Sequence, residues 1–196
     1  MNSPRIILAS TSRYRAELLG RILPGFEQQG SSVDETPLEN EAPSLRALRL
    51  SEAKARAIAA EAPDALIIGS DQVAECEGEA LGKPGDAATA KRQLQHCSGR
   101  TVVFHTGLCL IDTRSSEAPA STATDVTRVH FRTLDEASIE RYIEREKPFD
   151  CAGSFKCEGL GIALFERIES IDPTGLIGLP LITLARLLRE RGIAVP

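Results

Sequence analysis

Short apolar runs alternate along the chain with longer stretches in which apolar residues recur every three or four positions. The first run predicts a strand over 6–9, and the periodic stretch after it predicts a helix over 12–23. A second periodic stretch predicts a helix from 44 to about 62, which Pro63 ends. The next run, 65–68, is continuously apolar, which is typical of a strand buried on both faces.

The rest of the chain continues the alternation. Polar or glycine-rich stretches at 30–44, 112–120 and 149–161 predict loops. The other expected elements, in chain order, are a hairpin turn at Glu77-Gly78-Glu79, a helix of about ten residues capped by Asp86, antiparallel strands over 101–111 and 124–132, a helix opened by a Thr133–Glu136 capping box, a short strand near 162–168, and a helix from about 179 with Pro180 at its start and Gly192 at its end. The predicted fold class is α/β, a mixed sheet with flanking helices, in one domain over 1–196.

Composition narrows the function classes. The formal net charge is -5, which argues against stable nucleic-acid binding because such proteins are usually basic. No run of eighteen apolar residues predicts a membrane span, and no apolar stretch near the start suggests a signal peptide. The five cysteines are odd in number and form no C-x-x-C pair, so we expect reduced thiols and a cytoplasmic location. Cys151 and Cys157 are close enough in sequence for a regulatory disulfide, but free thiols are the simpler interpretation.

The first predicted strand passes through small hydroxyl residues into a helix that carries Arg15. Ser10, Thr11 and Ser12 are good helix N-cap residues, and the unpaired amides of a helix N-terminus attract anions. Arg15 adds a forked donor that suits phosphate. The pattern therefore indicates an anion site, although an ordinary capped helix with a solvated arginine fits it as well.

Acidic and basic residues elsewhere could complete such a site. Asp71 follows a buried strand, where ligands of α/β proteins often bind, although a turn aspartate fits equally well. Asp34 and Glu35 form an acidic pair. The pair suits a divalent cation, although ordinary surface charge fits it as well. Three lysines could bind phosphate or simply be solvated: Lys54, Lys83 and Lys156. Taken together, the set suits attack of a metal-activated water on a phosphoanhydride.

Seven segments resemble the Maf family of nucleoside triphosphate pyrophosphatases along nearly the whole chain. They are Leu8-Ala-Ser-Thr-Ser-Arg-Tyr-Arg15, Val33-Asp-Glu35, Glu52-Ala-Lys54, Gly69-Ser-Asp-Gln-Val73, Gly82-Lys-Pro84, Cys151-Ala-Gly-Ser-Phe-Lys-Cys-Glu-Gly159 and Gly178-Leu-Pro180. The resemblance implies an elongated Maf/ITPase-like fold, often dimeric, with two lobes around a nucleotide cleft. It also implies cleavage between the α- and β-phosphates, which releases a nucleoside monophosphate and pyrophosphate.

The resemblance assigns roles to matching positions. Asp71 is the expected proton acceptor and, with Glu35, a ligand of a divalent metal such as Mg²⁺, Mn²⁺ or Co²⁺. Lys54 and Lys83 are expected in the catalytic set as phosphate-binding lysines. Three further residues are expected to bind phosphates: Ser10, Ser12 and Arg15.

The branch of the family can also be inferred. Ser70-Asp71-Gln72 and Lys156-Cys157-Glu158 resemble the 7-methyl-GTP pyrophosphatase branch, which carries an aromatic residue at the position of Tyr14. Tyr14 could stack on the cationic 7-methylguanine ring, and Glu158 could accept its N1–H and 2-amino protons. Gln72 could read the O6 edge or fix a neighbour.

Two alternatives remain open: a dTTP/UTP pyrophosphatase of the same family, and a non-enzymatic regulator of septum formation. The net charge of -5 and only eight aromatic residues weigh against nucleic-acid readout by such a regulator.

Overall fold

The computed structural model describes residues 4–115 and 119–195, and these form two compact units. Unit 1 comprises Met1–Gln72, Thr106–Asp125 and Asp172–Pro196, and unit 2 comprises Val73–His105 and Val126–Ile171. The first three residues, and 116–118 of the polar loop predicted at 112–120, lie outside the described residues. The single domain expected over 1–196 stays a prediction.

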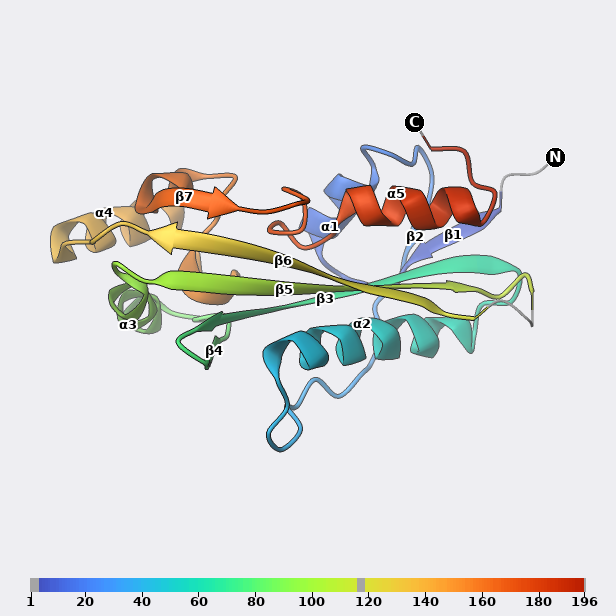
Figure 1. Ribbon diagram of the computed structural model, residues 1–196, viewed down its shortest axis with the longest axis horizontal. Helices are drawn as coiled ribbons and strands as arrows, with labels where there is room; N and C mark the ends of the chain where they lie inside the picture. Colours follow the sequence, from blue (N-terminus) through green and yellow to red (C-terminus); the bar gives the residue numbers. More distant parts are fainter. Residues whose placement is uncertain (1–3, 116–118, 196) are drawn as a thin grey trace. The chain divides into compact units, whose positions relative to one another are not determined.

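The fold is mixed α/β, as the sequence predicts. Seven strands follow the hydrogen-bonding order β2-β1-β3-β5-β6-β7, with β4 paired to β3 (Figure 1). Strand β1 is parallel to β2 and β3, whereas β4 and β7 are antiparallel to their neighbours, so the sheet is mixed. The strands are β1 (Arg5–Leu8), β2 (Glu27–Gln28), β3 (Ala65–Cys76), β4 (Glu79–Leu81), β5 (Thr101–Asp112), β6 (Ser121–Phe131) and β7 (Phe165–Glu169).

Helices cover both faces of the sheet in unit 1. Helices α1 (Arg13–Leu19) and α5 (Leu181–Glu190) lie on one face, and α2 (Pro43–Ala59) lies on the other (Figure 1). Alternate residues of the strands belong to the two cores: Leu66 and Ile68 pack with α1 and α5, and Ala65 and Ile67 pack with α2. Burial on both faces explains why this part of β3 is continuously apolar rather than alternating.

Two glycines let α2 approach the sheet closely. A Cβ atom on Gly69 of β3 would lie 2.2 Å from the Ser51 carbonyl oxygen, and one on Gly107 of β5 would lie 2.2 Å from that of Ala47. Both distances are far below van der Waals contact. The backbone of α2 therefore rests directly on these two positions.

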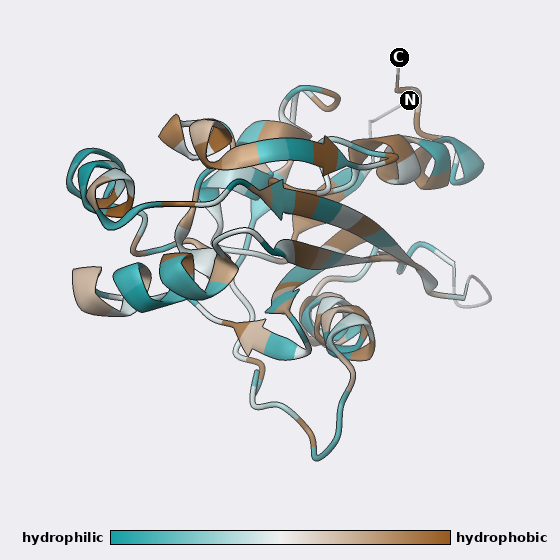
Figure 2. Cartoon of the chain, turned by 60° about the vertical axis from the view of Figure 1, so that its left-hand side comes forward, coloured by the Kyte–Doolittle hydropathy of each residue, from teal (hydrophilic) through white to brown (hydrophobic). Residues whose placement is uncertain are grey.

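Unit 2 is built on helices α3 (Ala87–Cys97) and α4 (Glu136–Glu146), with short 3₁₀ turns η1 (Ala152–Ser154) and η2 (Leu160–Leu164). In Figure 2 the helices of the chain carry both hydrophobic and hydrophilic residues, as expected of elements with one buried side. Four aromatic rings pack edge to face at centroid distances of 4.8 to 5.3 Å: Phe104, Phe131, Phe155 and Phe165.

Most predicted elements are confirmed. Asp86 caps α3, and Pro180 precedes α5. The Glu77-Gly78 turn has positive φ at both residues and joins β3 to β4 as a hairpin. The Phe131 amide donates to the Arg100 carbonyl, so the end of β6 returns to the start of β5, as the antiparallel prediction requires.

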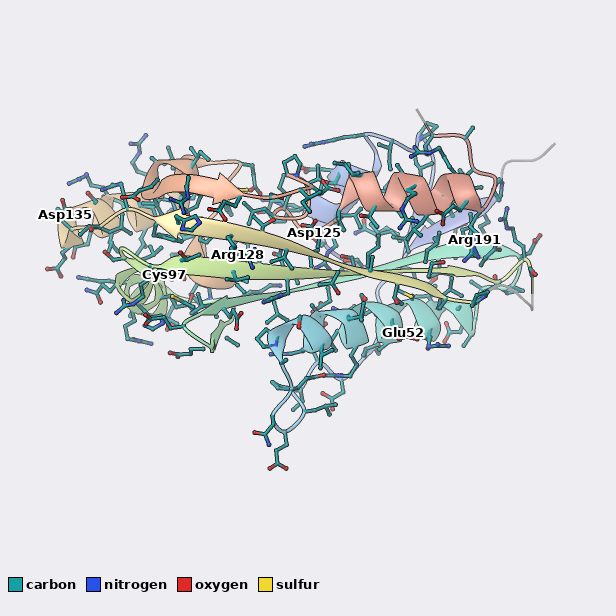
Figure 3. The ribbon with its side chains drawn as sticks, viewed as in Figure 1. Glu52, Cys97, Asp125, Arg128, Asp135 and Arg191 are labelled. Atoms are coloured by element: carbon teal, nitrogen blue, oxygen red, sulfur yellow. The ribbon has the colours of Figure 1, made fainter. Side chains whose placement is uncertain are left out.

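Several boundaries were wrong. Helix α1 ends at Leu19 rather than near residue 23, and the two-residue strand β2 was not predicted. Strand β3 does not stop near residue 68 but continues to Cys76. The cap of α4 is Asp135, labelled in Figure 3, whose side chain accepts from the Ser138 amide, so the Thr133–Glu136 capping box is wrong.

In the part of the chain that the structure describes, none of the helices combines the length and the apolar character that crossing a bilayer requires.

The close approach of α2 predicts the effect of a single methyl group. Gly69→Ala would force the new Cβ against the Ser51 carbonyl, and we expect a loss of about 2 kcal/mol of unfolding free energy, the usual effect of overpacking. Gly25→Ala is the matched control in the same unit, because nothing lies within 4 Å of its Cβ position. Urea denaturation measures both variants, and equal midpoints would contradict the prediction.

Candidate functional site

Lys54 joins two of the predicted carboxylates. Its Nζ lies 2.6 Å from Asp71 Oδ1 and 2.6 Å from Glu35 Oε1. Lys54 and Asp71 are each only 8% exposed, whereas the Glu35 side chain is largely exposed. Three residues far apart in sequence therefore meet at one point in unit 1.

The geometry of β3 explains how Asp71 reaches Lys54. Successive residues of a strand point to opposite faces, so Asp71 shares the α2 face with Ala65, Ile67 and Gly69. Gly69 brings the α2 backbone close, and Lys54 lies one turn beyond the Ser51 carbonyl that rests on it. Asp71 therefore does not follow the end of the strand, as predicted, but is a buried residue within β3. The alternative of a turn aspartate, left open by the sequence, does not hold.

Two arginines of α2 hold the loop that carries Glu35. Arg46 Nη2 donates to the Glu35 carbonyl at 2.9 Å, and Arg49 Nη2 donates to the Thr36 carbonyl at 3.2 Å. Arg49 also pairs in a bidentate manner with Glu41, at 2.7 Å from Nη2 to Oε2. This hydrogen bonding lowers the pKa of the Glu41 carboxyl to about 2. The loop is thus tied to α2 at the residue that supplies the second carboxylate.

Ser10, Ser12 and Arg15 form a second cluster in unit 1. Ser12 caps α1, its Oγ accepting from the Arg15 amide, which confirms the predicted hydroxyl cap. Arg15 Nη1 donates to Ser10 Oγ at 3.3 Å, and its Nε donates to the Gly178 carbonyl at 2.9 Å. Because α1 has only seven residues, the candidate anion-binding group here is the Arg15 side chain rather than a helix dipole.

Arg15 lies within the electrostatic range of both carboxylates. Burial lowers the pKa of its guanidinium, and the charges of Asp71 and Glu35 oppose that shift. The structure therefore brings six of the predicted site residues together within unit 1: Ser10, Ser12, Arg15, Glu35, Lys54 and Asp71. Lys83, which was also expected to bind phosphate, belongs to unit 2.

Tyr14 already has a cationic neighbour. The Arg13 guanidinium carbon lies 4.8 Å from the centroid of the Tyr14 ring, and Arg13 Nη2 donates to the Tyr14 hydroxyl at 3.0 Å. An arginine over an aromatic face is a favourable cation–π contact. A cationic base that stacks on Tyr14 must share the ring with Arg13 or displace it. Sequence reasoning did not anticipate this role of Arg13.

Gln72 and Ser70 lie on the face of β3 opposite to Asp71. Gln72 Nε2 lies within 3.1 Å of three oxygens, those of the Thr106 hydroxyl and the Gly175 and Leu176 carbonyls. Ser70 Oγ lies 2.8 Å from the Gly107 carbonyl and 2.9 Å from that of Gly178. The sequence left two roles open for Gln72, reading the O6 edge of the base or fixing a neighbour. The contacts of its amide nitrogen are those of a group that fixes a neighbouring segment.

The remaining predicted residues belong to unit 2. Lys83 and Glu158 are both exposed there. Lys156 contacts Asp150 at 3.5 Å, and its backbone amide donates to the Tyr142 hydroxyl.

The cysteine thiols are poor candidates for a nucleophile. All five cysteines are free, in agreement with the reduced thiols predicted, and burial raises the pKa of Cys151 and of Cys157 to about 12. Such thiols carry little thiolate near neutral pH. Among residues 4–115 and 119–195, no group of three His, Cys, Asp or Glu side chains gathers with the geometry of a metal site.

The donor set at Lys54 nevertheless fits a hard divalent cation. The two carboxylate oxygens that the Lys54 ammonium bridges are the oxygen donors that Mg²⁺ prefers. Mg²⁺ is commonly held by one or two carboxylates together with substrate phosphates. Two carboxylates suffice in such a site because the substrate supplies the other ligands.

Comparisons with known proteins identify the family and its named relatives. The family described as Maf-like protein matches residues 5–191. The chain is 55% identical over 193 residues to the 7-methyl-GTP pyrophosphatase of Xanthomonas oryzae pv. oryzae (strain MAFF 311018), covering 98% of this chain and 100% of the relative. It is 54% identical over 192 residues to a protein of the same name from Burkholderia pseudomallei (strain 1710b), covering 96% and 88%.

Solved structures agree with the fold. The Staphylococcus aureus Ham1 protein superposes with a TM-score of 0.53 at 14% identity, covering 95% of this chain and 99% of that one. A HAM1 protein from Coxiella burnetii gives the same score at 15% identity, covering 96% and 100%. At such identities the likeness concerns the fold alone.

The Arg49–Glu41 pair makes a prediction about pH. Because the Glu41 pKa in the folded protein lies below its usual 4.5, the pair stabilises the fold above about pH 4.5 and loses this effect as the pH falls towards 2. In Arg49→Gln the Glu41 pKa should rise towards 4.5, as followed by NMR titration of the carboxyl carbon. Arg56→Gln is the control, because Arg56 pairs with Glu52 on the same helix, and an unchanged Glu41 pKa in Arg49→Gln would contradict the prediction.

Proposed function

Because the chain belongs to the Maf family over residues 5–191, we propose that it is a nucleoside triphosphate pyrophosphatase whose substrate is 7-methyl-GTP. The reaction splits the bond between the α- and β-phosphates and releases 7-methyl-GMP and pyrophosphate. One observation carries the proposal: the Lys54 ammonium lies 2.6 Å from both Asp71 and Glu35, near Arg15. This geometry supports a site in which cations would bind a polyphosphate and carboxylates would hold a water and a metal.

The cationic side chains bind the triphosphate. Arg15 already donates through Nε and Nη1, which fixes its guanidinium plane while other N–H groups remain for phosphate oxygens. Ser10 and Ser12 add hydroxyl groups on the same segment. Lys54 offsets negative charge as it develops on the phosphates during bond cleavage.

Asp71 is the proton acceptor in this proposal. A water oxygen attacks the α-phosphorus, the bond from that phosphorus to the α–β bridging oxygen breaks, and the bridging oxygen leaves with pyrophosphate. The proton of the attacking water passes to the Asp71 carboxylate. Lys54 holds Asp71 Oδ1 at 2.6 Å and so fixes the orientation of that carboxylate.

Glu35 and Asp71 would hold the divalent cation, which stands here as a proposal for Mg²⁺, Mn²⁺ or Co²⁺. When bound, such a cation polarises phosphate oxygens and lowers the pKa of water. The Lys54 ammonium bridges the same two carboxylates, so the lysine and the cation would share them.

Recognition of the base is assigned to Tyr14 and Glu158. An aromatic face attracts the electron-poor, cationic 7-methylguanine ring, and the negative charge of a carboxylate attracts the positive charge of that ring. The roles of Glu158 at the base and of Lys83 at the phosphates stay predictions from the family resemblance. So do the nucleotide cleft between lobes, the homodimer, the absence of stable nucleic-acid binding and the cytoplasmic location.

A dTTP/UTP pyrophosphatase of the same family is the alternative. The names of the relatives favour 7-methyl-GTP over dTTP or UTP. A panel of canonical and modified triphosphates with Mg²⁺, Mn²⁺ or Co²⁺, scored for monophosphate and pyrophosphate, separates the two. Faster turnover of UTP or dTTP would reverse the assignment, and DNA binding without turnover of any triphosphate would favour the septum regulator.

Removal of the charge at residue 71 tests the mechanism. Asp71→Asn should reduce kcat by about 10³-fold or more while leaving the fold intact, since the amide cannot accept the proton. Asp64→Asn is the matched control, because Asp64 is exposed and Asn tolerates its positive φ. Steady-state kinetics and circular dichroism follow both variants, and near wild-type kcat in Asp71→Asn would remove Asp71 from the mechanism.

Substitutions at the base-reading positions test the specificity. Tyr14→Ala and Glu158→Gln should each raise KM for 7-methyl-GTP about tenfold more than KM for GTP, because both contacts favour a cationic base. Tyr14→Phe keeps the ring but loses the hydroxyl that accepts from Arg13, and it should keep the preference. Equal changes in KM for the two substrates would mean that neither residue reads the methylated base.

A further inference from the structure

The side-chain amide of Gln72 is fully occupied as a donor. Its two N–H bonds face three oxygens, the Thr106 hydroxyl at 3.0 Å and the carbonyls of Gly175 and Leu176 at 2.9 and 3.1 Å. Reading a base with this nitrogen would take a donor away from the buried carbonyls of Gly175 and Leu176, which is unfavourable. The contacts are those of a residue that holds a segment of chain in place.

Thr106 completes this attachment from the neighbouring strand β5. It is 1% exposed, and its hydroxyl donates to the Gly175 carbonyl at 2.9 Å while it accepts from Gln72. The Gly175 carbonyl therefore receives two donors from the sheet. A Cβ atom on Gly175 would lie 2.2 Å from Asp125 Oδ2, so only glycine fits there without displacement.

The segment 172–178 is also fixed to the start of α5. Asp172 is 1% exposed, and its carboxylate accepts from the Thr174 amide and hydroxyl and from the Ile182 amide. Thr174 Oγ1 accepts from the Leu181 amide at 2.9 Å. Gln72 and Thr106 thus attach the segment to the sheet, and its own Asp172 and Thr174 attach it to the start of α5.

Gly178 is where the segment meets the phosphate-binding arginine. Its carbonyl accepts from Arg15 Nε at 2.9 Å and lies 2.9 Å from Ser70 Oγ. Its φ of +122° suits glycine, and a Cβ atom there would lie 3.4 Å from Arg15 Nε. The direction of the Arg15 guanidinium therefore depends on where this carbonyl is held.

From these contacts we infer that Gln72 is a positioning residue, which fixes the segment 172–178 so that the Gly178 carbonyl aims Arg15 at the substrate phosphates. The inference rests on the proposed function, in which Arg15 binds the triphosphate. Because it acts through Arg15, Gln72 affects every triphosphate alike, whatever the base. A base-reading Gln72 would instead change the ratio of activities on 7-methyl-GTP and GTP.

Gln72→Met tests this distinction, because it keeps the length of the side chain and removes the donors. We expect kcat/KM to fall about tenfold for 7-methyl-GTP and for GTP alike, since small misplacements of binding groups are costly. Binding of inorganic tripolyphosphate, which has no base, should weaken to a similar degree in calorimetry. A change of more than about threefold in the 7-methyl-GTP to GTP ratio would overturn the inference.

The Arg15→Ala background tests whether the effect passes through Arg15. There, Gln72→Met should cause no further loss of tripolyphosphate affinity, because coupled residues are not additive. A purely structural role of Gln72 would give additive losses in the double variant, and additivity would overturn the inference. Thr106→Val, which removes the hydroxyl that accepts from Gln72, should reproduce the pattern and serves if Gln72→Met does not fold.

A spectroscopic measurement separates this inference from the proposed function. The Arg15 Nε–H, bonded to the Gly178 carbonyl, should give a slowly exchanging NMR signal that Gln72→Met shifts or broadens. If the wild-type protein hydrolyses no triphosphate, the proposed function fails, yet this signal still reports the positioning of Arg15. An unchanged signal in Gln72→Met would overturn the inference whatever the activity.

Discussion

The rest of the site depends on the contact of one ammonium group with two carboxylates. Lys54 is nearly buried, and removing a charge from water is costly unless partners replace the lost hydration. Asp71 and Glu35, each 2.6 Å away, provide those partners. The group of three carries a net negative charge beside Arg15, which suits a site that admits a cation and a polyphosphate together. Each member also fixes the direction of the others.

This contact requires close packing of α2 on the sheet. Gly69 and Gly107 leave room for the α2 backbone, and without that approach the Lys54 side chain would not reach Asp71 in the same geometry. Arg46 and Arg49 then extend the organisation from the helix to the loop of Glu35. One helix therefore supplies the lysine and also holds the loop carrying one of its two partners.

The sequence predicts the elements better than it predicts the site. The apolar run 65–68 correctly indicates a strand buried on both faces, but the polar residues Ser70 and Asp71 suggest that it ends there. It continues because Asp71 pairs with Lys54 of α2 and Ser70 donates to the Gly107 carbonyl of β5, contacts that a local pattern does not reveal. For the same reason a local pattern gives no sign of the contacts of Arg46 and Arg49, since their partners lie eight to thirteen positions away.

The alternation of β3 has a consequence for how this chain can vary. The odd-numbered Asp71 contacts Lys54 on one face of the strand. The even-numbered Ser70 and Gln72 contact the segment before α5 on the other face. A one-residue deletion within 69–72 would invert this parity and exchange the two sets of groups between faces. Point substitutions leave the parity intact. The evolutionary record of this strand should therefore lack insertions and deletions of odd length.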